Sequence, residues 1–213
     1  MKQIAQIMSE SRELQPTQQL SPTLQRRMTL VRETYGDRGK FLSTFNPSTQ
    51  LIAAKNTDRA FFGNAPSLGL LKKAYGDNMP VMFLLPQIYD LCEFTSAKKM
   101  SIEQATCLSE IIANEYGYLK ASELLLFFYR MKAGHYGKFY GSVDPMAVMV
   151  ALGEFMKERE QAYSKRSSEE RQRERDEMSK NAITLEEYCR SRGVKSFEEL
   201  LNNEKEDKSE SEA

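Results

Sequence analysis

The sequence has one histidine, three cysteines and no long hydrophobic run, and each shortage removes a class of function. His135 is the single imidazole, and the cysteines are odd in number, widely spaced and form no CxxC pair, so we predict no metal site and no cofactor. The cysteines are expected to be reduced thiols of a cytoplasmic protein, with Cys92 and Cys107 buried as small hydrophobic residues.

Signals of catalysis and of membranes are missing as well. The sequence contains no P-loop, no dinucleotide-binding glycine pattern, no nucleophile elbow and no HExxH motif. Its longest apolar stretches, residues 80–86 and 123–129, are far shorter than the roughly 20 residues of a membrane span. The first residues lack the apolar core of a signal peptide. We therefore expect a soluble protein that is not an enzyme and takes no small-molecule substrate.

The net charge of zero hides a division along the chain. Residues 1–153 carry 17 basic and 13 acidic side chains, a net charge of +4, whereas residues 181–213 carry 5 and 9, a net charge of −4. Residues 154–180 carry 8 of each sign. A mildly basic body followed by an acidic tail is a weak indication of a surface that faces a polyanion.

Helix start and stop signals recur along the chain, and no strand pattern competes with them. Ser21-Pro22 predicts the start of a helix that ends at Gly36 and has one apolar face, formed by Leu24, Met28, Val31 and Tyr35. Residues 37–63 predict an irregular crossing and then a short helix that ends at Gly63. Further helices are expected to start at Ser67, Pro80, Ser101, Ser122 and Asp144-Pro145. The helix from Pro80 should kink or break at Pro86. The helix from Ser101 begins with a capping box, Ser101–Gln104, and has Ile102 and Ile111 on its apolar face.

These signals predict an all-α fold in several parts. A helical bundle over residues 21–160 follows an N-terminal arm, residues 1–20. Apolar residues nearly vanish after Phe155, so residues 161–180 are expected to continue the last helix as a charged, solvent-exposed segment held by i,i+4 pairs such as Glu169–Arg173. Residues 181–203 predict a small helical hairpin, and residues 204–213 have the composition of a disordered acidic tail.

The predicted hairpin carries few apolar residues, chiefly Leu185, Tyr188, Phe197 and Leu200. That number is too small for a segment that folds alone. The hairpin therefore either docks on the body or binds another protein through these side chains.

The segment Phe127–Gly141, FFYRMKAGHYGKFYG, is the most informative part of the sequence. No acidic residue lies between Glu123 and Asp144, and aromatic residues alternate with basic ones over three glycines. Basic side chains contact phosphates and aromatic rings stack on bases, so this mixture suits single-stranded nucleic acid. We predict weak contact through exposed side chains, namely Arg130, Lys132, His135, Tyr136, Lys138 and Tyr140.

A structural interpretation of the same segment stays open. A turn between two helices can place its aromatic residues in the core, and Phe127 and Phe128 are expected there in either case. Asp144 is interpreted as a helix N-cap and not as a catalytic carboxylate.

The same stretch also carries a resemblance. Its pattern is a leucine-rich helix, a Gly-x-Tyr-Gly-Lys-Phe-Tyr-Gly loop at residues 134–141, then Val-Asp-Pro and an amphipathic helix. This pattern, together with residues 58–77 upstream, resembles an uncharacterised family of phages and mobile elements of gut Bacteroidota over roughly residues 58–160. The resemblance implies no activity, but its setting favours DNA metabolism over small-molecule chemistry.

Three functions follow from these observations. The first is a non-enzymatic accessory factor of phage or mobile-element DNA metabolism, by analogy with replication-initiation or helicase-loading adaptors. It would contact nucleic acid weakly through the loop and a protein through its C-terminus. The alternative is a pure protein–protein adaptor or virion-associated structural protein. The third is a metal nuclease whose carboxylates converge from distant segments.

Overall fold

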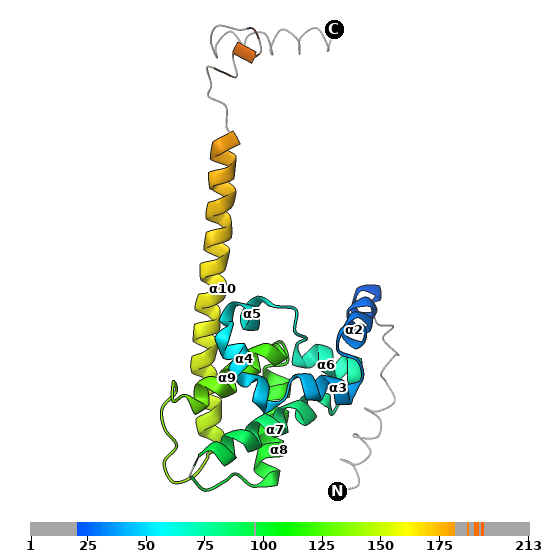
Figure 1. Ribbon diagram of the computed structural model, residues 1–213, viewed down its shortest axis with the longest axis vertical. Coiled ribbons are helices and arrows are strands. Elements are labelled where there is room, and N and C mark those ends of the chain that lie inside the picture. Colours follow the sequence, from blue (N-terminus) through cyan, green and yellow to red (C-terminus); the bar gives the residue numbers. More distant parts are fainter. Residues whose placement is uncertain (1–20, 96, 182–186, 188–189, 192, 194–213) are drawn as a thin grey trace, which may run out of the picture. The chain divides into compact units, whose positions relative to one another are not determined.

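The computed structural model describes residues 21–95, 97–181, 187, 190–191 and 193, and over these residues the predicted all-α fold is confirmed (Figure 1). The elements are α2 (Pro22–Tyr35), α3 (Arg38–Thr44), η1, a 3-10 helix (Pro47–Thr49), α4 (Gln50–Lys55), α5 (Thr57–Phe62), α6 (Leu68–Tyr75), α7 (Met79–Phe94), α8 (Ile102–Glu115), α9 (Ala121–Lys132) and α10 (Pro145–Asn181). The chain divides into two compact units, Met1–Arg159 and Glu160–Ala213. The predicted arm, the acidic tail and the four apolar hairpin residues lie outside the described residues.

Several helix ends follow the sequence signals. The Ser21 hydroxyl accepts a hydrogen bond from the Leu24 amide (3.3 Å), and α2 ends at Gly36, whose positive φ of 74° favours glycine. The capping box of α8 is complete, because Ser101 and Gln104 each accept a hydrogen bond from the other's backbone amide.

The prediction for residues 37–63 was wrong in part. A short helix ends at Gly63 as expected, but the expected irregular crossing contains α3 and η1, and the expected single helix is divided into α4 and α5. Asp37 caps α3 by accepting from the Lys40 amide (2.8 Å), and Asn56 separates α4 from α5 by accepting from the Arg59 amide (2.9 Å). Asp and Asn side chains of this kind can start a new helix directly after the previous one ends. A search for apolar periodicity misses such breaks, since each helix is only about two turns long.

Helix α9 begins at Ala121, one residue before the predicted cap. The N-cap is Lys120, whose amide donates to the buried carboxylate of Glu123 (2.8 Å). The Ser122 hydroxyl instead donates to the Ala60 carbonyl oxygen (2.7 Å) and so joins α9 to α5. A serine near a helix start was therefore mistaken for its cap.

Two further details differ from expectation. Of the kink or break expected at Pro86, the break does not occur, because helix α7 runs through Pro86. Pro86 and Met82 are both exposed, so water can satisfy the Met82 carbonyl that loses its amide partner. On α8, Cys107, Ile102 and Ile111 are exposed and not buried, because only a narrow stripe of that helix faces the core.

The core of the first unit is built around α9, which packs against α4, α5 and α7 (Figure 1). Phe127 and Phe128 are fully buried, as predicted. The Phe155 ring of α10 lies 5.7 Å from the Phe61 ring and 5.6 Å from the Phe127 ring, measured between centroids. This aromatic cluster fixes the end of α9 and the start of α10, and therefore the segment that joins them.

In the second unit, the described part of α10 from residue 160 onward has no buried side chain. The ion pairs that form are Lys165–Glu169 (3.9 Å) and Arg166–Glu170 (2.9 Å), one turn earlier than the suggested Glu169–Arg173 pair. Exposed pairs of this kind contribute only a few tenths of a kcal/mol each. None of the described helices has the length and apolar character that a membrane span requires.

Candidate functional site

The candidate site is the segment of residues 133–144 between α9 and α10. It starts where the backbone leaves α9 at Gly134, which has a positive φ of 79°. The Gly134 amide donates to the Met131 carbonyl (3.0 Å) and the His135 amide donates to the Arg130 carbonyl (3.1 Å). This pair of bonds is a Schellman motif, which requires the left-handed residue that glycine supplies.

The far end of the segment is anchored by Lys98 and Val143. The Lys98 amide donates to the Gly141 carbonyl (2.8 Å), and the Val143 amide donates to the Lys98 carbonyl (2.9 Å). Val143 is buried, and the Asp144 carboxylate accepts from the Met146 amide (3.1 Å) at the start of α10, which agrees with the predicted capping role. The loop is therefore held at both ends, and Lys98 lies beside the end that leads into α10.

Arg130 points into the bundle and not toward solvent. It donates to the carboxylate of Glu158 on α10, and its side chain is 16% exposed. Its guanidinium carbon also lies 5.8 Å from the Phe61 ring centroid and 5.9 Å from that of Phe155. The charge of Arg130 is thus already compensated within the protein.

Lys132 is compensated in the same way. Its ammonium donates to the Asp90 carboxylate of α7 (2.6 Å) and lies 5.7 Å from the Phe94 ring centroid. Its side chain is only 18% exposed, so this ion pair is better sheltered from solvent than the pairs of α10 beyond residue 160.

The expectation that Tyr136 is exposed was wrong. The ring is half-buried, with its centroid 5.9 Å from that of Phe127. Burial, and secondly the negative charge of Glu158, raise the pKa of the Tyr136 hydroxyl well above its ordinary value. We call Arg130, Lys132 and Tyr136 the inner set, since all three are engaged with the body of the protein.

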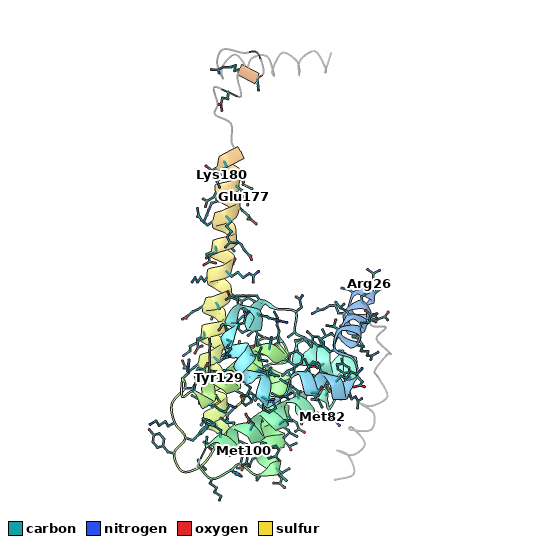
Figure 2. The ribbon with its side chains drawn as sticks, in the orientation of Figure 1. Arg26, Met82, Met100, Tyr129, Glu177 and Lys180 are labelled. Atoms are coloured by element: carbon teal, nitrogen blue, oxygen red, sulfur yellow. The ribbon has the colours of Figure 1, made fainter. Side chains whose placement is uncertain are left out.

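The remaining predicted residues, His135, Lys138 and Tyr140, are exposed, and we call them the outer set. Tyr140 is 89% exposed, the highest value among the large hydrophobic side chains of the described residues. The side chains of Lys138 and Tyr140 make no hydrogen bond or ion pair within the part of the chain that the structure describes. Figure 2 shows side chains of this segment extending away from the helices.

Sequence reasoning missed Lys98, which is exposed beside the outer set. It precedes the loop by some forty positions, and no local signal links the two. Sequence reasoning also missed the carboxylates of Asp90 and Glu158, because the acid-free stretch of sequence does not show which acids other helices bring to it. Among the described residues, no group of three or more His, Cys, Asp or Glu side chains could hold a metal ion.

Comparisons with known proteins give a match to an uncharacterised family. A family model described as a family of unknown function (DUF6633) matches residues 99–199, which include α8, α9, the loop and α10. No curated protein and no solved structure matches the chain. The matched residues overlap the sequence resemblance over residues 99–160.

Proposed function

We propose that this protein is a non-enzymatic accessory factor of phage or mobile-element DNA metabolism that binds single-stranded nucleic acid weakly through the outer set. The supporting observation is Tyr140, an almost fully exposed ring in a stretch, residues 133–143, that has no acidic side chain. Such a ring is available for a base to stack on, and stacking on aromatic rings is tolerant of sequence. The phage or mobile-element setting rests on the sequence resemblance alone.

Two lysines support the same proposal. Lys138 lies two residues before Tyr140, and Lys98 is held to the loop by the backbone hydrogen bonds at Gly141 and Val143. A ring flanked by cations can hold one base and the neighbouring phosphates. The inner set would position the loop and would not touch nucleic acid. The C-terminal segment would bind a protein partner.

A protein–protein adaptor is the second candidate. It is favoured by two exposed apolar side chains at the start of α10, Met146 (68% exposed) and Val150 (66% exposed). With Tyr140 they could form the rim of a protein contact.

Fluorescence anisotropy with a labelled single-stranded oligonucleotide at low salt separates the two candidates. We expect Tyr140→Ala to weaken binding about fivefold or more, because a stacked ring contributes about 1–3 kcal/mol. Tyr89→Ala removes another exposed tyrosine, on α7, and should bind as the wild type does. If no binding occurs at low salt, or if Tyr140→Ala binds normally, the loop is structural and the adaptor takes first place.

A further inference from the structure

A cleft of about 700 Å³ lies in the first unit, between the end of α2, the segment from α3 to the turn after α5, and the first turn of α9. Ser122 and Leu125 line it from α9, so it begins roughly 10 Å along that helix from the loop. The volume is in the range of small-molecule sites. The nucleic-acid proposal above makes no use of this cleft.

The cleft is lined by two cations and by no carboxylate. Lys55 and Arg59 border it, and neither forms an ion pair within the described part of the chain. Asp58 precedes Arg59 but does not line the cleft. Two other clefts differ in this respect: Asp90 pairs with Lys132 in one, and Asp37 lies among the basic residues of the other.

Tyr35 supplies a positioned hydroxyl at the same place. Its ring is held edge-on by the rings of Phe41 (5.8 Å) and Phe45 (5.3 Å), and its hydroxyl has no hydrogen-bond partner among the described residues. Burial raises the pKa of the Tyr35 hydroxyl, and the nearby charge of Arg59 partly opposes that rise. The hydroxyl is therefore a proton donor at neutral pH, close to the guanidinium.

The backbone around Arg59 is fixed. Asn56 accepts from the Arg59 amide, and the Arg59 carbonyl accepts from the Gly63 amide (2.9 Å). A Cβ atom at Gly63 would lie 2.4 Å from that carbonyl oxygen, so only glycine allows this close turn. The backbone that carries Arg59 is thus already ordered, so binding an anion need not order it further.

The cleft also has apolar lining residues. They are Phe45, Ile52, Ala53 and Leu125. A ligand that fills the cleft would therefore combine an anionic group, placed at Tyr35 and Arg59, with a flat or apolar body against these side chains.

We infer that this cleft binds a nucleoside phosphate, either free or as the phosphorylated end of a strand. Arg59 and Lys55 bind the phosphate, the Tyr35 hydroxyl donates to one of its oxygens, and the base lies against the apolar side chains. This departs from the sequence-based expectation of no small-molecule ligand, which rested on the absence of known motifs. A site assembled from α2, α4, α5 and α9 has no local motif.

Isothermal titration calorimetry at low salt tests the inference with adenosine 5′-monophosphate, adenosine and a 5′-phosphorylated dinucleotide. We expect the monophosphate to bind and adenosine to bind at least about tenfold more weakly, since a hydrogen bond to a charged group is worth roughly that factor. A dinucleotide that binds more tightly than the monophosphate indicates a strand end, and the reverse order indicates a free nucleotide.

Variants assign the binding to the cleft. Arg59→Ala and Lys55→Ala should each weaken monophosphate binding about tenfold, and both side chains are exposed, so at least one variant should fold normally. Arg38→Ala changes an exposed arginine that does not line the cleft and should leave binding unchanged. Tyr140→Ala should also bind normally, which separates this inference from the loop proposal. Equal binding of monophosphate and adenosine, no binding of either, or normal binding by both folded cleft variants would overturn the inference.

Discussion

The inner and outer sets come from one short stretch of sequence with one composition, yet they have opposite environments. Arg130 and Lys132 each contact a carboxylate and an aromatic ring, whereas Lys138 has no such partner among the described residues. Tyr136 packs on the core, whereas Tyr140 is almost fully exposed. The difference does not lie in the residues themselves.

Partners from distant helices decide the difference. Glu158 and Asp90 are delivered by α10 and α7 to the last turn of α9, where they pair with Arg130 and Lys132, and within the described residues neither pairs with a basic side chain beyond the Schellman turn at Gly134. A basic side chain that precedes this turn is compensated, and one that follows it is free to meet another molecule. The position of one glycine therefore separates structural from available charges.

The largest expected loss of stability concerns the buried carboxylate of α9. Glu123 is 0% exposed, and it accepts from Arg159 (2.8 Å) and from the Lys120 amide. Glu123→Ala should lower the free energy of unfolding by about 3 kcal/mol, because it removes a fully buried carboxylate that accepts from both the Arg159 guanidinium and the Lys120 amide. Urea unfolding measures this loss, with Glu169→Ala on the exposed part of α10 as the control, expected within about 0.5 kcal/mol of wild type. A loss below about 1 kcal/mol for Glu123→Ala would contradict internal compensation.

A smaller effect is expected within the loop stretch itself. Arg130→Ala should lower the free energy of unfolding by about 1–2 kcal/mol, because Glu158 loses its partner and two rings lose a stacked cation. Lys138→Ala should stay within about 0.5 kcal/mol of wild type. Equal losses in the two variants, measured by urea unfolding, would remove the distinction between the two sets.

The pH dependence of stability gives a third comparison. Below pH of about 10 the Tyr136 hydroxyl is protonated in both states, so it has no effect on stability there. At higher pH the unfolded chain loses this proton while the raised pKa in the folded protein retains it, so stability falls as pH rises. Tyr136 should account for up to about 1.4 kcal/mol per pH unit of that fall, beside smaller shares from Tyr35 and Tyr75. Tyr136→Phe should make the decline above pH 10 shallower; an unchanged decline would contradict the packing of Tyr136.

The sequence allowed the class of fold and many helix ends to be predicted, because capping side chains and glycines act locally. The Ser21 cap, the Ser101 capping box and the end of α9 at Gly134 are examples. It did not reveal how residues 37–63 divide into separate short helices, where Asn56 ends α4 and caps α5.

The candidate site was predictable only in part, because only its local features can be read from the sequence. The loop and its acid-free composition can be read from residues 124–143. The ion pairs that Arg130 and Lys132 form with carboxylates, the contact of Lys98 with the loop and the cleft around Arg59 are different features. Each depends on residues more than twenty positions apart in the sequence. Such contacts follow from tertiary packing, which periodicity and local motifs do not encode.

The salt dependence of oligonucleotide binding tests the central claim most directly. If only Lys98 and Lys138 meet phosphates, the slope of log affinity against log salt should be about −1.4, since each neutralised phosphate of a single strand adds about −0.7. Lys138→Ala should reduce the slope to about −0.7, whereas Lys132→Ala, in folded protein, should leave it at about −1.4. A slope that changes with Lys132→Ala and not with Lys138→Ala would contradict the account, because it would place the inner set, and not the outer set, against the nucleic acid.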